Sequence, residues 1–346
     1  MDNVVKNILI FFLIIVCFYL IAELSTLLQP LVLALILALM FHPLVLKIAK
    51  SKIPNWLIIP LIIIITLGII YGLLNVIFFS VSEIGSQGKY LIDKFNEKIN
   101  LFLLWLSNIT GYQISVEKLF KGFIKSINSE FLSKTAGNLA GKISSFTGSF
   151  VIFSIYYIVF IGSMINTEKF IEYLFDKDEN KYLELYKKIY DSVIKYMAVK
   201  SLISIATGLI VYFVCIIFGI RFAILWGFIT IILNFIPSIG SIIATIPPLI
   251  MAIIQFDSIL PILILLIILI IIQFSIGNII EPKIMGNRLK LNTITVIFGL
   301  LFWGYIWGIV GMMLSIPLLV ILKLIFENIP SLTIIAKLMS SPNYNK

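Results

Sequence analysis

The sequence predicts an all-α polytopic membrane protein, and three observations support this fold class. The 346 residues are 60% hydrophobic and 12% charged, with a mean hydropathy of +1.11, which is far more apolar than a soluble globular chain. The apolar residues are gathered in long runs, and most of the basic residues lie in the gaps between these runs. A bilayer accepts outward-facing Ile and Leu, and it admits helices because they satisfy their own backbone groups.

Eight apolar segments have roughly the length of a membrane span. The first is too long for a secretory signal peptide and is not followed by a small-x-small cleavage site, so we expect it to be retained as a span. The eight segments are Ile8–Leu28, Leu31–Leu46, Trp56–Phe79, Phe150–Ile165, Leu202–Phe218, Phe222–Ile254, Ile259–Ile280 and Ile294–Leu322.

The short loops predict the orientation, because short cytoplasmic loops are rich in Lys and Arg. The loop after the second segment and the loop before the last one are basic, whereas the opposite short loops hold Glu23, Arg221 and Asp257. We therefore expect both termini in the cytoplasm. The net charge of +9 is explained by this topology, and without a basic stripe with interleaved aromatics it does not indicate nucleic-acid binding.

Two inserts between the spans show helical spacing. The outer insert has apolar residues at steps of three or four, as at Phe95, Ile99, Leu103 and Leu106, and again at Leu119, Phe123 and Ile127, which predicts a small helical cap. The inner insert carries a similar stripe, at Tyr182, Leu185, Ile189 and Val193, which predicts an amphipathic cytoplasmic helix leading into the fifth span.

These features divide the chain into six parts. They are a three-span scaffold (1–79), an extracytoplasmic helical insert (80–149), a fourth span (150–165), a cytoplasmic amphipathic helix (166–200), a transport unit (201–322) and a cytoplasmic tail (323–346).

The sixth segment is too long for one span. Its 33 residues would extend about 50 Å as a straight helix, against about 30 Å of hydrocarbon. Its middle reads NFIPSIGSIIATIPPL, in which Pro237, Gly240, Pro247 and Pro248 break the helix. This pattern predicts a re-entrant helical hairpin.

The last segment repeats the pattern as GIVGMMLSIPLL. Gly308 and Gly311 stand where Pro237 and Gly240 do, and Ser315-Ile316-Pro317 repeats Thr245-Ile246-Pro247 after a one-residue gap. Two broken segments entering from opposite faces form an inverted repeat, which is typical of a transporter binding site. The alternative is that the glycines only allow close helix packing.

If the hairpins form, their tips would line a solute site near the bilayer midplane. Unwound backbone and neutral side chains there suit a small polar solute, although each side chain could instead bond another helix. The candidate site residues are Asn234, Pro237, Ser238, Gly240, Ser241, Thr245, Pro247, Gln273, Asn278, Gly308, Gly311, Ser315 and Pro317.

At these residues the chain resembles a known family. The stretches NFIPSIGSIIATIPPL, GNIIEPKIMGNRLKLN and FWGYIWGIVGMMLSIPL are similar to signature blocks of the autoinducer-2 exporter family, the TqsA- and PerM-like membrane transporters. The resemblance is carried by residues 202–322 and by hydropathy alone before them. It implies export of the quorum-sensing signal autoinducer-2 from a bacterial cell, across the plasma membrane, and some relatives are described as sodium or lithium/proton antiporters.

Glu281 is the candidate for ion coupling. An acid at membrane depth suggests a proton or sodium site, with Lys283 or Arg288 as its partner, and Pro282 is expected to end the seventh helix there. The alternative is an interfacial ion pair that holds the loop.

Three classes of function follow. The first is export of a small polar metabolite, most of all autoinducer-2, the second is sodium (or lithium)/proton antiport, and the third is a membrane scaffold without transport. We expect no enzyme, because the chain has no H-E-x-x-H, no G-x-S-x-G and no paired intramembrane aspartates. We also expect no cofactor or metal, since His42 has no second ligand nearby. A homo-oligomer is expected by fold analogy.

Overall fold

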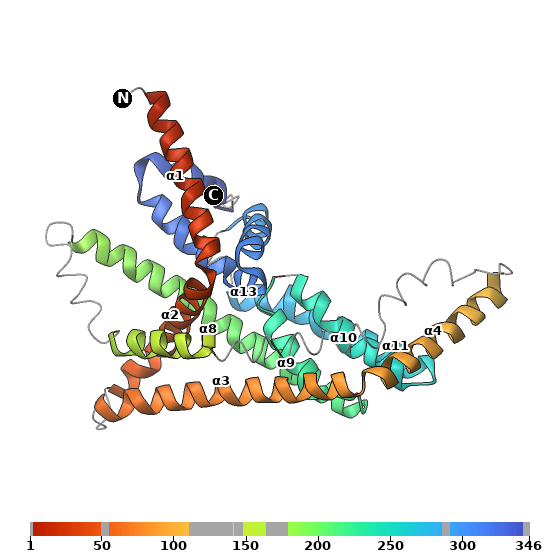
Figure 1. The fold of residues 1–346 in the computed structure, drawn as a ribbon. Coiled ribbons are helices and arrows are strands. Elements are labelled where there is room, and N and C mark those ends of the chain that lie inside the picture. Colours follow the sequence, from red (N-terminus) through yellow and green to blue (C-terminus); the bar gives the residue numbers. More distant parts are fainter. Residues whose placement is uncertain are drawn as a thin grey trace. The chain divides into compact units, whose positions relative to one another are not determined.

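A computed structural model describes residues 3–49, 55–110, 141, 148–163, 179–237, 239–285 and 291–341, and these residues are almost entirely helical (Figure 1). This confirms the all-α fold class. The main elements are α1 (Asn3–Glu23), α2 (Ser25–Ala49), α3 (Asn55–Ser86), α4 (Gly88–Thr110), the helix Gly148–Ser163, α8 (Glu179–Ile217), α9 (Ala223–Leu233), α10 (Ile239–Gln255), α11 (Ile259–Ser275), the π-helix η2 (Ile276–Ile280), α12 (Glu281–Met285), α13 (Thr293–Glu327), the 3₁₀-helix η3 (Pro330–Leu332) and α14 (Thr333–Met339).

The helices form two compact units. Unit 1 comprises Met1–Leu67, Gly148–Leu202 and Glu281–Lys346, and unit 2 comprises Gly68–Thr147 and Ile203–Ile280. The four boundaries fall inside α3, at the start of the helix Gly148–Ser163, inside α8 and at the start of α12.

Within the described part of the chain, four helical stretches are long and apolar enough to cross a membrane: Pro60–Ser86, Leu183–Ile217, Ile259–Met285 and Thr293–Glu327. A fifth candidate is the pair Ile15–Glu23 and Ser25–Phe41, which meets at a bend of 84° beside Leu24. Gly148–Ser163, α9 and α10 are apolar but shorter. The chain is thus polytopic, whereas a total of eight apolar membrane segments stays a prediction.

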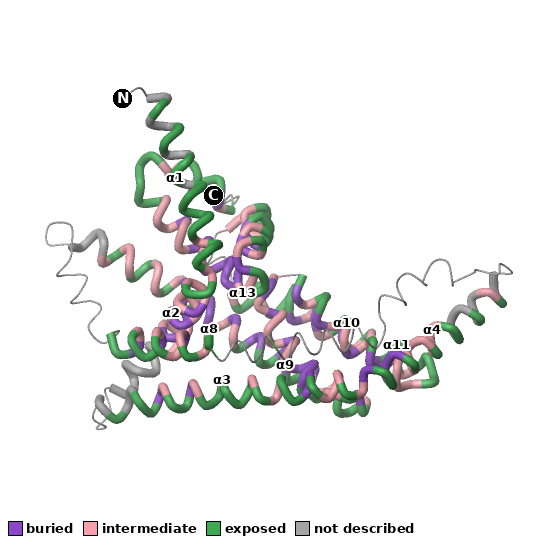
Figure 2. The backbone as a smooth tube through the Cα atoms, viewed as in Figure 1, coloured by how far each residue is buried: buried purple, intermediate pink, exposed green. Residues whose placement is uncertain are grey.

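The long helices expose apolar side chains over most of their length. Ile64 and Phe79 on α3 are 68% and 70% exposed, and Ile217 and Ile294 are 79% and 80% exposed. Figure 2 shows that exposed residues predominate along α3. Such surfaces would be unfavourable in water, and they match the hydrocarbon of a bilayer.

α8 joins the predicted amphipathic helix to the fifth span. It runs for 39 residues without a break, which is about 58 Å and well beyond the roughly 30 Å of hydrocarbon. This confirms the expectation that the inner insert leads into the span as a helix from residue 179 onward. Residues 164–178 lie outside the described part of the chain.

α4 confirms the helical prediction for the first half of the outer insert, which includes Phe95 and Ile99. The second predicted stripe, at Leu119, Phe123 and Ile127, lies outside the described residues. The start of α4 belongs to the core of unit 2, where it contacts α10. The buried residues of this core are Leu91, Val211, Cys215, Ile220, Leu225, Trp226, Met251, Ala252, Leu265 and Leu269.

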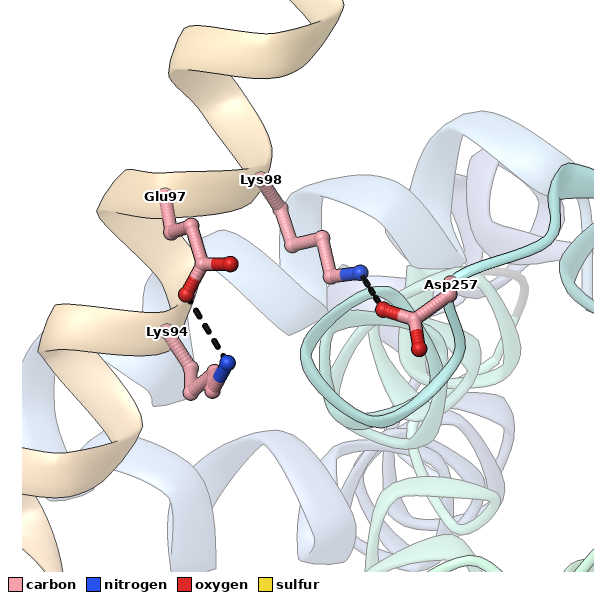
Figure 3. Close-up of polar contacts among 4 residues, drawn as sticks. All are labelled: Lys94, Glu97, Lys98 and Asp257. Atoms are coloured by element: carbon pink, nitrogen blue, oxygen red, sulfur yellow. Dashed lines mark hydrogen bonds and ion pairs between the residues drawn. The ribbon is translucent and has the colours of Figure 1, made fainter.

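Polar contacts hold α4 against the loops of unit 2. Lys98 forms an ion pair with Asp257 in the loop between α10 and α11, and on α4 itself the Lys94 ammonium lies 2.9 Å from a Glu97 carboxylate oxygen (Figure 3). Arg221 donates a 2.9 Å hydrogen bond to the side-chain oxygen of Gln87, which directly precedes α4. The predicted outer loops are therefore tied to the start of the outer insert.

The Lys98–Asp257 pair predicts a pH-dependent contribution to stability. The hydrogen bond from Lys98 holds the pKa of Asp257 below its ordinary value of 3.8. A depressed carboxylate pKa stabilises the fold above the unfolded-state pKa, and this stabilisation is lost as pH falls through the folded-state pKa. Thermal unfolding should therefore show wild type slightly more stable than Asp257→Asn at pH 7, with the difference shrinking below about pH 4.

The matched control for this prediction is the same substitution in a Lys98→Met background, where the difference should be absent at every pH. The pair is largely solvent-exposed on the Asp257 side, so the effect should be small and should weaken further in high salt. A wild-type advantage that stays constant from pH 7 to pH 3.5 would contradict it.

Candidate transport site

The sixth apolar segment folds as two short helices that pack against each other, α9 and α10. The helical hydrogen bonds of α9 continue through Asn234 and end before Pro237. The backbone N–H of Asn234 still donates to the Thr230 carbonyl. Proline has no N–H to donate and its ring clashes with the preceding turn, which favours a break at this position. The predicted break is therefore present at Pro237.

The expectation that Gly240, Pro247 and Pro248 also break the helix is wrong, because all three lie inside the continuous helix α10. A proline removes only its own amide hydrogen bond, and packing against neighbouring helices can compensate for that loss.

Gly240 sets how closely these two helices approach. A Cβ atom built on Gly240 would lie 1.7 Å from the carbonyl oxygen of Leu233, the last residue of α9. Side chains of any size are excluded by this backbone contact, and glycine is required for steric reasons.

The last segment is also broken, at Gly308 inside α13. Gly308 has φ 62° and ψ −141°, which is not helical and is a backbone conformation that glycine alone adopts readily. The two halves of α13 fold back on each other, since Cβ atoms built on Gly299 and Gly304 would meet Leu319 and Met312.

Gly311 holds the position in this second pair that Gly240 holds in the first. A Cβ on Gly311 would lie 1.9 Å from the carbonyl oxygen of Trp303. Gly240 follows its contact residue by seven positions and Gly311 by eight. Each broken segment thus closes on a glycine against a backbone carbonyl.

Two of the predicted polar residues are engaged in bonds within unit 2. Asn234 is buried and donates a 3.0 Å hydrogen bond from Nδ2 to Oγ of Ser204 on α8, which is the helix-to-helix alternative. Thr245 donates a 2.8 Å bond to the Ile242 carbonyl in its own helix. In this conformation the Asn234 amide N–H and the Thr245 hydroxyl already donate hydrogen bonds within the protein.

Gln273 and Ser315 are buried without such bonds. Gln273, on α11 in unit 2, is 8% exposed, and neither its amide nitrogen nor its amide oxygen has a hydrogen-bond partner among the described residues. Ser315, in the second half of α13 in unit 1, is fully buried and its hydroxyl is likewise without a partner in that part of the chain. Unpaired buried polar groups are unfavourable, so these two side chains are the strongest candidates for contacts with a solute.

The other predicted residues lie in varied surroundings. Gly240, Gly311 and Pro317 are buried, Pro237, Ser241 and Pro247 are half-buried, Asn278, Lys283 and Gly308 are exposed, and Ser238 and Arg288 lie outside the described residues.

Glu281 forms a buried ion pair inside unit 1, and its partner is Lys200. The Lys200 ammonium lies 2.5 Å from the Glu281 carboxylate, and the two side chains are 2% and 18% exposed. The sequence-based expectation had named Lys283 or Arg288 instead. Removing two charges from water is expensive, and the pairing is what makes both burials tolerable.

Lys200 is the candidate site residue that the sequence does not single out, although a signal for it is present. The apolar stripe of α8 passes through Val193 and continues at helical steps to Tyr196 and Lys200, all three of which are buried. A lysine on a buried stripe near the middle of a long apolar helix is a reason to look for a carboxylate partner.

Pro282 does not end the seventh helix, contrary to expectation. The chain runs through the π-helix η2 into α12, and Pro282 is the second residue of α12. In the first turn of a helix the amide N–H has no partner within that helix, so proline is tolerated there. Glu281 is thereby held at the start of a helical turn and not in a loop.

Within the described residues, no group of three or more His, Cys, Asp or Glu side chains lies close enough to hold a metal ion. Cys215 is buried and Cys17 is exposed, and both are free thiols. The side chain of His42 lies outside the described part of the structure.

Apolar helices broken at proline and glycine, with buried neutral polar groups and a buried ion pair, define the class of polytopic membrane transporters. The chain belongs to the AI-2E transporter family, whose family model matches residues 7–331. This confirms the family resemblance and makes the chain a multi-pass membrane transporter.

Three relatives have names that describe a transport protein or a putative one. A Haemophilus influenzae protein called "Putative transport protein" is 30% identical over 318 residues, covering 87% of this chain and 86% of its own. The AI-2 transport protein TqsA of Escherichia coli is 42% identical over 153 residues, which is 44% of each chain. YhhT of Escherichia coli is 27% identical over 301 residues, covering 86% of this chain and 83% of its own. The family and these relatives agree with the prediction that the chain is not an enzyme.

Proposed function

We propose that this chain exports a small polar metabolite, autoinducer-2 in the first place, across the bacterial plasma membrane. The observation that carries the proposal is the pair of broken apolar segments, each closed on a glycine, with uncharged polar groups buried at Gln273 and Ser315. The 42% identity to TqsA over part of the chain supports autoinducer-2 as the first solute to test.

In this proposal α9–α10 and α13 are the two re-entrant hairpins of an inverted repeat. α9 and α10 have 11 and 17 residues, or about 17 and 26 Å, so each is shorter than the roughly 30 Å of hydrocarbon. Short arms that end inside the membrane leave backbone groups at their tips, and a transported solute can bond to these groups. A site shared by the two tips stays a prediction, as does a homo-oligomer.

The decisive experiment is transport in proteoliposomes made with the full chain. Autoinducer-2 uptake should exceed that of protein-free vesicles and should fall roughly tenfold in Gln273→Leu and Ser315→Ala, because each fixed partner contributes on the order of 1.4 kcal/mol to binding. The matched control is Thr245→Val, whose hydroxyl already bonds its own helix and whose loss should matter little. Absence of uptake by the wild type would overturn the proposal.

Cation/proton antiport is the second candidate, and the buried Lys200–Glu281 pair is the observation that favours it. The same vesicles, loaded with sodium under an imposed pH gradient and without autoinducer-2, separate the two functions. Sodium-dependent proton movement without any autoinducer-2 uptake would favour the antiporter.

The proposed topology places both termini in the cytoplasm and predicts a labelling pattern. In a background without Cys17 and Cys215, Ser107→Cys on α4 should react with an impermeant thiol reagent in intact cells, whereas Ser192→Cys on α8 should react only after permeabilisation. The reason is that the positive-inside rule places the outer insert outside and the start of α8 inside. The reverse pattern would invert the orientation and, with it, the assignment of export.

A further inference from the structure

A pocket of about 230 Å³ lies in unit 1 between α8 and α12. Asp191, Ser192, Lys195 and Tyr196 line it from α8, and Ile284 and Met285 line it from α12. Asp191 and Lys195 are more than half exposed and form their own ion pair at 3.1 Å, so the mouth of the pocket is polar and open to water.

The buried ion pair lies one helical turn beyond this pocket on both helices. Lys200 follows Tyr196 by four positions, and Glu281 precedes Ile284 and Met285 by three and four positions. Residues at these spacings share a helix face and are about 6 Å apart along the axis. On both helices the Lys200–Glu281 pair therefore lies about one turn from residues that line the pocket and on the same helix face.

Tyr196 stands between the pocket and the pair. The residue lines the pocket, yet its hydroxyl is buried and has no hydrogen-bond partner among the residues that the structure describes. A buried hydroxyl without a partner, one helical turn from Lys200 on the same face of α8, is an arrangement that a mobile proton or water can complete.

In the described parts of α8 and α12, the other charged residues near this site are paired with each other or exposed. On α8 the remaining charged residues of this region, Asp191 and Lys195, neutralise each other at the mouth, and on α12 the Lys283 side chain is exposed. α2 approaches α8 through the uncharged Met40 thioether, 3.9 Å from the Ser201 hydroxyl. Lys200 is thus the group whose charge balances Glu281 in the described structure.

We propose that Glu281 is a proton-binding site reached from this pocket past Tyr196, and that Lys200 is the counter-ion which protonation releases. A proton from pocket water adds to the carboxylate, giving a neutral acid, while the ammonium keeps its charge and loses its partner. An unpaired ammonium in a buried site is strongly unfavourable, so the helices that carry it must rearrange. Proton binding is thereby coupled to the movement that transports the solute, an inference that rests on the proposed transport function.

The test for coupling is autoinducer-2 accumulation in proteoliposomes under a gradient of one pH unit. If one proton exchanges for one solute molecule, wild type should reach a concentration ratio of about ten. Glu281→Gln should still exchange solute at equal concentrations on both sides, but its accumulation ratio should fall to about one. If Glu281→Gln does not fold, the double variant Glu281→Gln/Lys200→Met, which removes both charges, replaces it in the same test. Lys283→Gln is the matched control, and its accumulation ratio should equal that of wild type.

A second readout does not depend on any solute. A cysteine is placed at position 192 by Ser192→Cys in a background without Cys17 and Cys215, and its alkylation rate is measured against pH. When Glu281 is present, the rate should change with pH by more than the titration of the thiol explains. When Glu281→Gln is added, this extra change should disappear. Identical pH profiles in both backgrounds, or an unchanged accumulation ratio in Glu281→Gln, would overturn the proton site while leaving the export function standing. If wild type moves no autoinducer-2, the export function fails and the alkylation profile alone decides the proton site.

Discussion

Replacing Gly240 or Gly311 with alanine should abolish most transport and destabilise the fold. Each new Cβ would lie less than 2 Å from a backbone carbonyl oxygen, whereas real Cβ contacts stay beyond 3.0 Å, so the paired helices must separate. Overpacking of this kind lowers the free energy of unfolding by about 1–3 kcal/mol. The loss at these two sites should lie near the upper value, because a backbone carbonyl cannot move aside as a side chain can. Uptake of autoinducer-2 should fall roughly tenfold or more, because ångström-scale misplacement of fixed partners weakens each of their contacts.

Matched controls for these substitutions exist in both units. A Cβ on Gly72 in unit 2 or on Gly162 in unit 1 would meet nothing within 4 Å. Alanine at such helical positions is expected to be neutral or to stabilise by up to about 1 kcal/mol, because it lowers the backbone entropy of the unfolded chain. Two measurements, thermal unfolding in detergent and autoinducer-2 uptake, should therefore separate the Gly240 and Gly311 variants from the Gly72 and Gly162 variants. Gly240→Ala and Gly311→Ala proteins as active and stable as the controls would show that the close contacts do not matter.

Lys200→Met should be the most destabilising single charge deletion in the described part of the chain. It leaves the Glu281 carboxylate buried without its partner, and breaking a buried pair in this way typically costs about 3–5 kcal/mol. The double variant Lys200→Met/Glu281→Gln should regain much of this loss, because no uncompensated charge remains. A double-mutant cycle measured by thermal unfolding gives the coupling free energy of the pair directly.

Lys195→Met is the control for Lys200→Met, since it removes a lysine from the same helix. Its partner Asp191 and Lys195 itself are both more than half exposed, so the expected loss is about 0–1 kcal/mol. If the two lysine variants unfold at the same temperature, the Lys200–Glu281 pair is not buried in the protein as the structure has it.

Much of the class and architecture of this protein is determined by local features of the sequence. Long apolar runs, basic short loops and their spacing predict a helical membrane protein, because these properties act over one helix at a time. The breaks at Pro237 and in the GIVG stretch of the last segment could also be predicted, since proline and glycine are the residues that most readily interrupt a helix. Which of them do so could not be predicted, because Pro247, Pro248 and Pro317 lie inside helices. The signature stretches between residues 234 and 318 were enough to indicate the family that the match over residues 7–331 confirms.

Only the tertiary structure decided which polar groups are paired. Asn234 and Ser204 are 30 positions apart, and Lys200 and Glu281 are 81 positions apart, so no local pattern could join them. The sequence offered Lys283 as a partner for Glu281, but side chains close in sequence need not share a face. A distant lysine on the long helix α8 pairs with Glu281 instead. Burial then selects among the candidates, because a charge or an amide removed from water must find a partner wherever the packing of the helices supplies one.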